Sequence, residues 1–199
     1  MGKYTCEGLG TIPGGNYDEL TIEGVFSAKN EITANTLVCE GVINFSDSVR
    51  ADSLHMEGVI NTKGYLYAGN MHMEGVLNAN QIMVAGNISA DGCICTNSLT
   101  ADNAVLYYDS SKDTPKPFAC VRSLLFGHKI SNNHSASIGE IQTGTLEITD
   151  YNVHYISGND IIIGPNCVVD TVSADKRLRI HRSATVDTIT GAATPEYYD

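Results

Sequence analysis

The sequence predicts an all-β fold, a right-handed parallel β-helix (β-solenoid) with about 17 residues per coil, in two blocks joined by an irregular insert. An acidic residue followed by glycine recurs about every 17 residues, and apolar residues take every second position around it, as in strands. Ankyrin, armadillo and tetratricopeptide repeats need roughly 33 to 47 residues per unit and are excluded. The recurring pairs are Glu23-Gly24, Glu40-Gly41, Glu57-Gly58, Glu74-Gly75 and Asp91-Gly92.

Each repeat has room for about three short strands, so that each residue column forms a ladder with rungs about 4.8 Å apart. The inward columns are Leu20, Leu37, Leu54, Met71 and Ile88, then Phe26, Ile43, Ile60, Leu77 and Ile94, then Ile32, Val49, Leu66, Met83 and Leu99. The repeat closes with the alanine column Ala34, Ala51, Ala68, Ala85 and Ala101. The last interval of this column is one residue short, which predicts a residue dropped from a turn.

A second block of coils follows after an interruption. Pro115 and Pro117 cannot donate to a ladder and predict a loop, and the apolar face of residues 118–126 has helical spacing. Apolar positions then recur about 17 residues apart in the pairs Ile163 and Ile180, Val169 and Val186, Val172 and Ile189. We therefore expect an N-terminal cap over 1–19, a first block over 20–105, a linker or short helix over 106–129, a second block over 130–191 and a tail over 192–199.

Composition limits the functions open to the chain. Its 23 acidic and 12 basic side chains give a net charge of −11, so the basic surface that nucleic acid needs is missing. The first residues contain no signal peptide or membrane span, so we expect a cytoplasmic protein, with the inner face of the membrane as its alternative place. Cys39, Cys93 and Cys167 stand at packing positions, which predicts reduced thiols. The spacing of Cys93 and Cys95 is a weak metal signal, and no metal or cofactor is expected.

The acidic residues Glu23, Glu40, Glu57, Glu74 and Asp91 form one column. Carboxylates about 4.8 Å apart repel one another, so this column must face water or bind a positive ligand. Exposure at a bend is the first interpretation, with glycine supplying an unusual backbone angle. The alternative is a monomeric binding module that holds a cation, a glycan or a basic protein on this face. Calcium prefers about six to eight oxygens around one point, and a straight row of single carboxylates supplies few.

Two polar columns have structural interpretations. Asn44, Asn61 and Asn78 can hydrogen-bond through stacked amides from coil to coil. His55 and His72 should lie on adjacent rungs of an outer face. No nucleophile or orienting acid is placed in the sequence to make these histidines catalytic, so we interpret them as surface residues.

The repeat does not predict an enzyme. β-Helical lyases and hydrolases place acids or bases in a groove formed by long loops, and the uniform turns of the first block leave no such groove wall. Asp170 and Asp187 recur with the repeat and so have the pattern of turn residues. We expect no catalytic residues.

The repeat resembles that of a known family. The pattern in Leu54-His55-Met56-Glu57-Gly58 through Leu66-Tyr67-Ala68, and the stretch from Ile161 to Asp170, are similar to the two-block members of the bactofilin, or polymer-forming cytoskeletal, family from Gram-positive bacteria. The resemblance covers about 20–105 and 130–191. It implies a right-handed β-helix that polymerises through its end coils without nucleotide, linked to cell shape and to cell-wall or membrane-associated proteins.

From this resemblance we expect the chain itself as the main partner, in a homo-oligomer or filament. Family members often bind membrane through an apolar N-terminal segment, and the polar start Met1-Gly2-Lys3 does not predict direct membrane binding. Terminal coils leave backbone groups unpaired, which a further coil would satisfy. The expected contact residues are Leu20, Ile22, Val25 and Phe26 at one end, and Leu178, Ile180, Val186 and Ile189 at the other.

Overall fold

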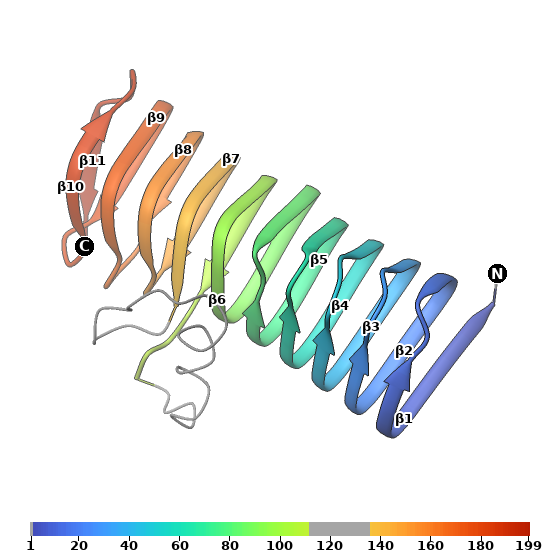
Figure 1. Cartoon of the computed structure of the whole chain (residues 1–199). Helices are drawn as coiled ribbons and strands as arrows, with labels where there is room; N and C mark the ends of the chain where they lie inside the picture. The colour runs from blue at the N-terminus through green and yellow to red at the C-terminus, as the bar shows by residue number, and fades with distance from the viewer. Residues whose placement is uncertain (1, 112–135) are drawn as a thin grey trace.

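A computed structural model describes residues 2–111 and 136–199. The chain forms a rod of stacked coils, with the N-terminus at one end and the C-terminus in the last coil at the other (Figure 1). The predicted fold class is confirmed, because 82% of the structure is strand and the parallel sheet winds into a β-solenoid of about 10 turns with about 17 residues per turn. The described ranges contain no helix.

The described residues form eleven strands of one sheet, and the first ten follow one another along the rod in chain order. They are β1 (Lys3–Ile12), β2 (Gly15–Ala28), β3 (Ile32–Phe45), β4 (Val49–Thr62), β5 (Tyr65–Asn78), β6 (Gln81–Tyr107), β7 (Ser137–Thr149), β8 (Asn152–Ile163), β9 (Val168–His181), β10 (Thr185–Thr190) and β11 (Pro195–Tyr198). Each of β1 to β9 pairs in parallel with the next, and β11 pairs with β9 beside β10. The last coil is thus built from two short strands.

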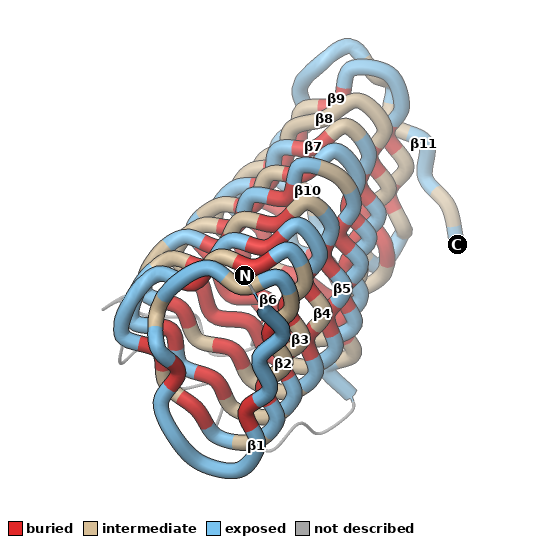
Figure 2. The backbone as a smooth tube through the Cα atoms, turned by 90° about the vertical axis from the view of Figure 1, so that its right-hand side faces the viewer, coloured by how far each residue is buried: buried red, intermediate tan, exposed pale blue. Residues whose placement is uncertain are grey.

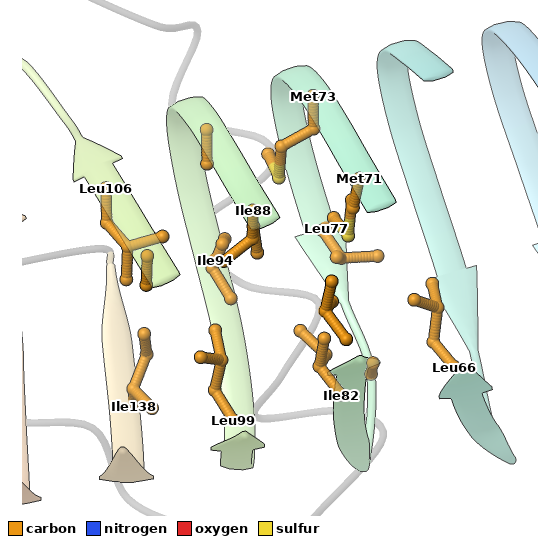
Figure 3. Close-up of a cluster of buried hydrophobic side chains, with 14 of the residues drawn as sticks. Leu66, Met71, Met73, Leu77, Ile82, Ile88, Ile94, Leu99, Leu106 and Ile138 are labelled. Atoms are coloured by element: carbon orange, nitrogen blue, oxygen red, sulfur yellow. The ribbon is translucent and has the colours of Figure 1, made fainter. Parts of the chain in front are cut away.

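The interior is a continuous apolar column that runs the length of the rod. Buried and exposed residues alternate along each strand, and the buried positions line up from coil to coil (Figure 2). Leucine, isoleucine and methionine side chains from successive coils point inward and pack on one another, as Met71, Leu77 and Ile94 do (Figure 3). The pairing register confirms most predicted columns, including Leu20 with Leu37 and Leu37 with Leu54.

Two predicted columns were wrong at their fourth member. Leu66 pairs with Ile82, and Ala68 pairs with Val84, where the sequence pattern predicted Met83 and Ala85. Ile82 is fully buried, whereas Met83 is 38% exposed. The residue is therefore dropped one coil earlier than predicted, and a register shift between Ala68 and Met71 restores the alignment.

The N-terminal residues form a further coil where we predicted a cap over 1–19. Strand β1 pairs with β2 along its whole length, with Glu7 opposite Glu23 and Gly8 opposite Gly24. The acid-glycine column therefore begins at Glu7. The sequence pattern missed it because the interval is one residue shorter here and because Gly10 stands in the apolar column of Phe26.

The two predicted blocks form one uninterrupted sheet. Strand β6 pairs directly with β7, from Cys95 opposite Ser137 to Tyr107 opposite Thr149. Leu106, assigned to the linker by the sequence, is buried and belongs to β6. The predicted loop at Pro115 and Pro117 and the apolar segment 118–126 lie outside the described residues. The predicted repeats of the second block are confirmed by the pairing of β9 with β8 and β10.

The glycine column is required by the backbone. Gly41, Gly58 and Gly75 have φ angles of 115°, 113° and 119°, which side chains rarely adopt. A Cβ atom added to Gly58 would lie 2.3 Å from the carbonyl oxygen of Gly41 in the preceding coil. The glycines thus allow both the bend and the close approach of neighbouring coils at this corner.

Candidate functional site

The acidic column follows the exposed side of the glycine corner. Every predicted member, Glu23, Glu40, Glu57, Glu74 and Asp91, is exposed, and consecutive members pair across the strands. The column therefore faces water, as the first interpretation predicted. Binding of a cation, a glycan or a basic protein on this face stays a prediction. Within the described ranges no group of three or more histidine, cysteine or acidic side chains converges as a metal site.

Two histidines stack beside this column. The rings of His55 and His72 lie 5.1 Å apart between centroids and are inclined by 12°, which confirms their predicted position on adjacent rungs. His55 Nε2 lies 3.5 Å from Glu57 Oε1, and His72 Nε2 lies 3.8 Å from Glu74 Oε1. Protonated rings would be attracted by these carboxylates and repelled by each other.

The N-terminal contact residues predicted from the sequence do not lie at the end of the rod. Leu20, Ile22 and Phe26 are buried because β1 covers them. Val25 remains 47% exposed, but on the flank of the rod, in a column that starts with Leu9 at 81%. The terminal surface is β1 itself.

The C-terminal contact residues divide into two groups. Leu178 and Ile180 are buried, because β11 pairs with β9 at these positions. Val186 and Ile189 are in β10, partly buried against the core, and belong to the last coil as predicted. The tail predicted over 192–199 is thus largely the strand that completes this coil.

Two basic side chains hold the C-terminal strand. Arg179 Nε lies 3.6 Å from Glu196 Oε2, and its guanidinium carbon lies 4.5 Å from the ring centroid of Tyr198. Arg182 Nε lies 2.8 Å from Asp199 Oδ1. Part of the basic charge around the last coil is therefore bound within the chain.

Amide side chains form ladders along the rod. Asn61 Nδ2 donates to Asn44 Oδ1, and Asn78 Nδ2 donates to Asn61 Oδ1, each at 2.8 Å, which confirms the predicted stacking. The sequence pattern did not single out a second ladder, in which Asn103 Nδ2 donates to Asn87 Oδ1 at 2.9 Å. Thr145 Oγ1 extends it across the junction of β6 and β7 by donating to Asn103 Oδ1 at 2.6 Å.

The cysteines in the described ranges are buried, as expected for packing residues. Burial raises the pKa of Cys39 far above its ordinary value and that of Cys167 to about 11, so both thiols remain protonated at neutral pH. The sulfur atoms of Cys93 and Cys95 lie 3.8 Å apart. Neutral, buried thiols are unreactive, and this agrees with a packing role for Cys39 and Cys167.

Sequence reasoning missed a groove on the flank of β3 to β6. It has a volume of about 570 Å³ and is lined by Thr33, Ala34, Asn35, Arg50, Ala51, Asp52, Tyr67, Ala68, Gly69, Met83, Val84, Ala85, Thr100, Ala101 and Asp102. The predicted alanine column was the available signal, because a line of small buried residues lets the surface sink between larger neighbours. We call this feature the lateral groove.

No family model, curated protein or solved structure matches this chain. Over residues 2–111 and 136–199 no helix is long and apolar enough to cross a membrane.

Proposed function

We propose that this protein is a non-enzymatic structural scaffold that self-associates through its terminal coils, as the sequence resemblance to bactofilins implies. The supporting observation is that, in the described part of the chain, β1 pairs only with β2, and β10 and β11 pair only with β9. Their outer edges carry backbone groups that need water or another chain as a partner. A coil from a second copy provides such a partner.

The sides of the rod are less suited to strand addition than the ends. In the described part of the chain, each of the strands β2 to β8 has a neighbouring strand on both edges, so its backbone groups are less available to another chain. The acidic column also places like charges along one flank, which repel the same flank of another copy. Growth is therefore directed along the axis of the rod.

In this proposal the scaffold acts in the cytoplasm, near the inner face of the membrane, with cell-wall or membrane-associated proteins as further partners. The buried thiols of Cys39 and Cys167, which remain as free thiols, support a reducing compartment. The family resemblance supports the partners.

A proline in β1 tests end-to-end association while leaving the β1–β2 ladder intact. Asp18 N–H donates to Gly2 C=O, so Gly2, Tyr4 and Cys6 direct their backbone groups to β2, and Thr5 directs its own outward. Thr5→Pro removes one outward N–H donor, whereas the matched variant Thr5→Val keeps it. Sedimentation velocity should show oligomers without nucleotide for the wild type and Thr5→Val, and smaller species for Thr5→Pro.

Electron microscopy of the same three preparations should show rods joined end to end for the wild type and Thr5→Val. Wild-type protein that remains strictly monomeric at high concentration contradicts the proposal. So does a Thr5→Pro variant that is folded by circular dichroism and assembles as the wild type does.

A further inference from the structure

The lateral groove has a floor of small buried residues and two walls of outward-facing residues. Ala51, Ala68 and Ala101 belong to the floor and are buried. One wall contains Thr33, Arg50, Tyr67, Met83 and Thr100, and the other contains Asn35, Asp52, Gly69, Ala85 and Asp102. Successive wall residues come from successive coils, about 4.8 Å apart, so the groove runs parallel to the axis of the rod.

The centre of the groove is apolar. Tyr67 and Met83 are paired neighbours on one wall, and Met83 is among the exposed large apolar residues of the rod. Gly69 and Ala85 face this region from the other wall and project at most a methyl group. A ligand side chain of leucine size can therefore reach Met83 and the buried floor at this point.

The position of Tyr67 is fixed by its neighbours. The guanidinium carbon of Arg50 lies 4.0 Å from the ring centroid of Tyr67, a cation–π contact, and Arg50 Nε lies 3.1 Å from Glu31 Oε1. Glu31 offsets the charge of Arg50. These contacts favour the observed orientation of Tyr67, which lowers the cost of ordering this side chain when a ligand binds.

Both ends of this apolar centre are acidic. Asp52 and Asp102 stand on the same wall, are exposed, and form no ion pair with a described base. Three coil spacings separate them, which is about 14 Å along the axis. An extended peptide rises about 3.4 Å per residue, so residues four apart in an extended chain span the same distance.

From this match we infer that the lateral groove binds an extended basic segment of another protein, with Lys or Arg at positions i and i+4 and an apolar residue at i+2. Side chains at these positions project from the same side of an extended chain. The two basic groups pair with Asp52 and Asp102, and the apolar side chain packs against Met83 and Tyr67. The net charge of −11 attracts such a segment from a distance.

This surface is distinct from the acidic column. Asp52 and Asp102 flank the buried alanine floor, whereas Glu57 and Glu74 stand at the glycine corner and have no part in the lining of the groove. The inference does not depend on self-association, because the whole lining comes from one chain. A monomeric protein would bind the segment equally well.

Fluorescence anisotropy with a labelled peptide, GSKSLSKSG, tests the inference on the full chain at low ionic strength. The double variant Asp52→Asn/Asp102→Asn should weaken binding about tenfold, as expected for loss of two exposed ion pairs. Met83→Ser should weaken peptide binding without changing the salt dependence of the affinity. The matched variant Glu57→Gln/Glu74→Gln removes the same charge from the acidic column and should leave the affinity within about twofold.

A second peptide of the same composition, GSSKKLSSG, places the basic residues side by side and should bind more weakly. Equal binding of the two peptides overturns the inference, because it shows attraction to net charge alone. An equal loss of peptide affinity in Asp52→Asn/Asp102→Asn and in Glu57→Gln/Glu74→Gln overturns the inference for the same reason. Circular dichroism melts of all variants identify any change caused by misfolding, and none of the substituted residues is buried in the core.

Discussion

The phenol of Tyr151 donates a hydrogen bond of 2.5 Å to the carbonyl oxygen of Gly92, across 59 residues of chain. In the earlier coils each glycine carbonyl of this column lies close beneath the next glycine, as Gly75 does beneath Gly92. Gly92 is the last glycine of this column within residues 2–111. The fully buried Tyr151, packed edge-on against Tyr108, therefore completes the end of the glycine column.

Tyr151→Phe should destabilise the protein while keeping its shape. The substitution removes the donor to the Gly92 carbonyl, and loss of a hydrogen bond at this half-buried residue costs about 0.5 to 1.5 kcal/mol. Urea unfolding followed by circular dichroism measures the change. Tyr65→Phe, at an exposed ring, is the matched control and should alter the free energy of unfolding by less than about 0.5 kcal/mol.

Two glycine substitutions separate backbone strain from close contact. Gly8 has φ of 92° and open space where a Cβ would lie, whereas Gly58 has φ of 113° and would place a Cβ 2.3 Å from a backbone oxygen. Gly8→Ala should cost about 1 to 2 kcal/mol, and Gly58→Ala at least about 3 kcal/mol. Thermal melts of both variants compare the two costs. Equal melting temperatures would show that the coils do not approach as closely as described.

Asn61→Ala should weaken the amide ladder at its middle. Asn61 donates to Asn44 and accepts from Asn78, and Asn78 is buried, so its side-chain amide loses its acceptor. We expect a loss of about 1 to 3 kcal/mol in urea unfolding. Asn35→Ala removes an exposed asparagine from the groove wall and should be near neutral.

Arg179→Ala should loosen the C-terminal strand without unfolding the rod. The Arg182 N–H donates to the Tyr198 carbonyl at 3.0 Å, so its hydrogen exchange reports on whether β11 is docked. Loss of the contacts to Glu196 and Tyr198 should lower the free energy of undocking β11 by about 0.5 to 1 kcal/mol. The hydrogen exchange of the Arg182 N–H should then be several-fold faster. Lys176→Ala removes an exposed base elsewhere on β9 and should leave the exchange rate unchanged.

Alkaline pH should destabilise the fold through its buried thiols. Burial raises the pKa of Cys167 to about 11 from an ordinary 9.0. The unfolded thiol loses its proton first, so this stabilising contribution is complete below about pH 8.5 and disappears as pH rises toward 11. Cys167→Ala should reduce the fall in unfolding free energy over this range by about 2 kcal/mol. If the unfolding free energy of Cys167→Ala fell as steeply with pH as that of the wild type, Cys167 would not be the source of this pH dependence.

The solenoid could be predicted from sequence because its coils repeat the same residues at the same places. Deviations from the period caused the errors. Met83 was placed inside because a constant interval was assumed, and the first coil was missed because Glu7-Gly8 stands one residue off the period. A constant 17-residue interval does not show in which coil a residue has been dropped. Ile82 is buried in place of Met83 because it is Ile82 that packs against Leu66 in the preceding coil.

The surfaces were harder to predict than the core. The C-terminal strand has no repeat signature, since its docking depends on Arg179 and Arg182 reaching forward to side chains about 17 residues later. The lateral groove forms where neighbouring coils have small residues at the same position. The alignment of the small residues Gly69 and Ala85 becomes visible only once the register of the coils is known. The amide ladder, in contrast, needed only equal spacing, and its prediction was confirmed.

The one-dimensional order of the strands has a mechanical consequence. Each coil contacts chiefly the coil before it and the coil after it, so a tensile load along the axis passes through every interface in series. The yield force is then that of the weakest single interface and does not grow with length.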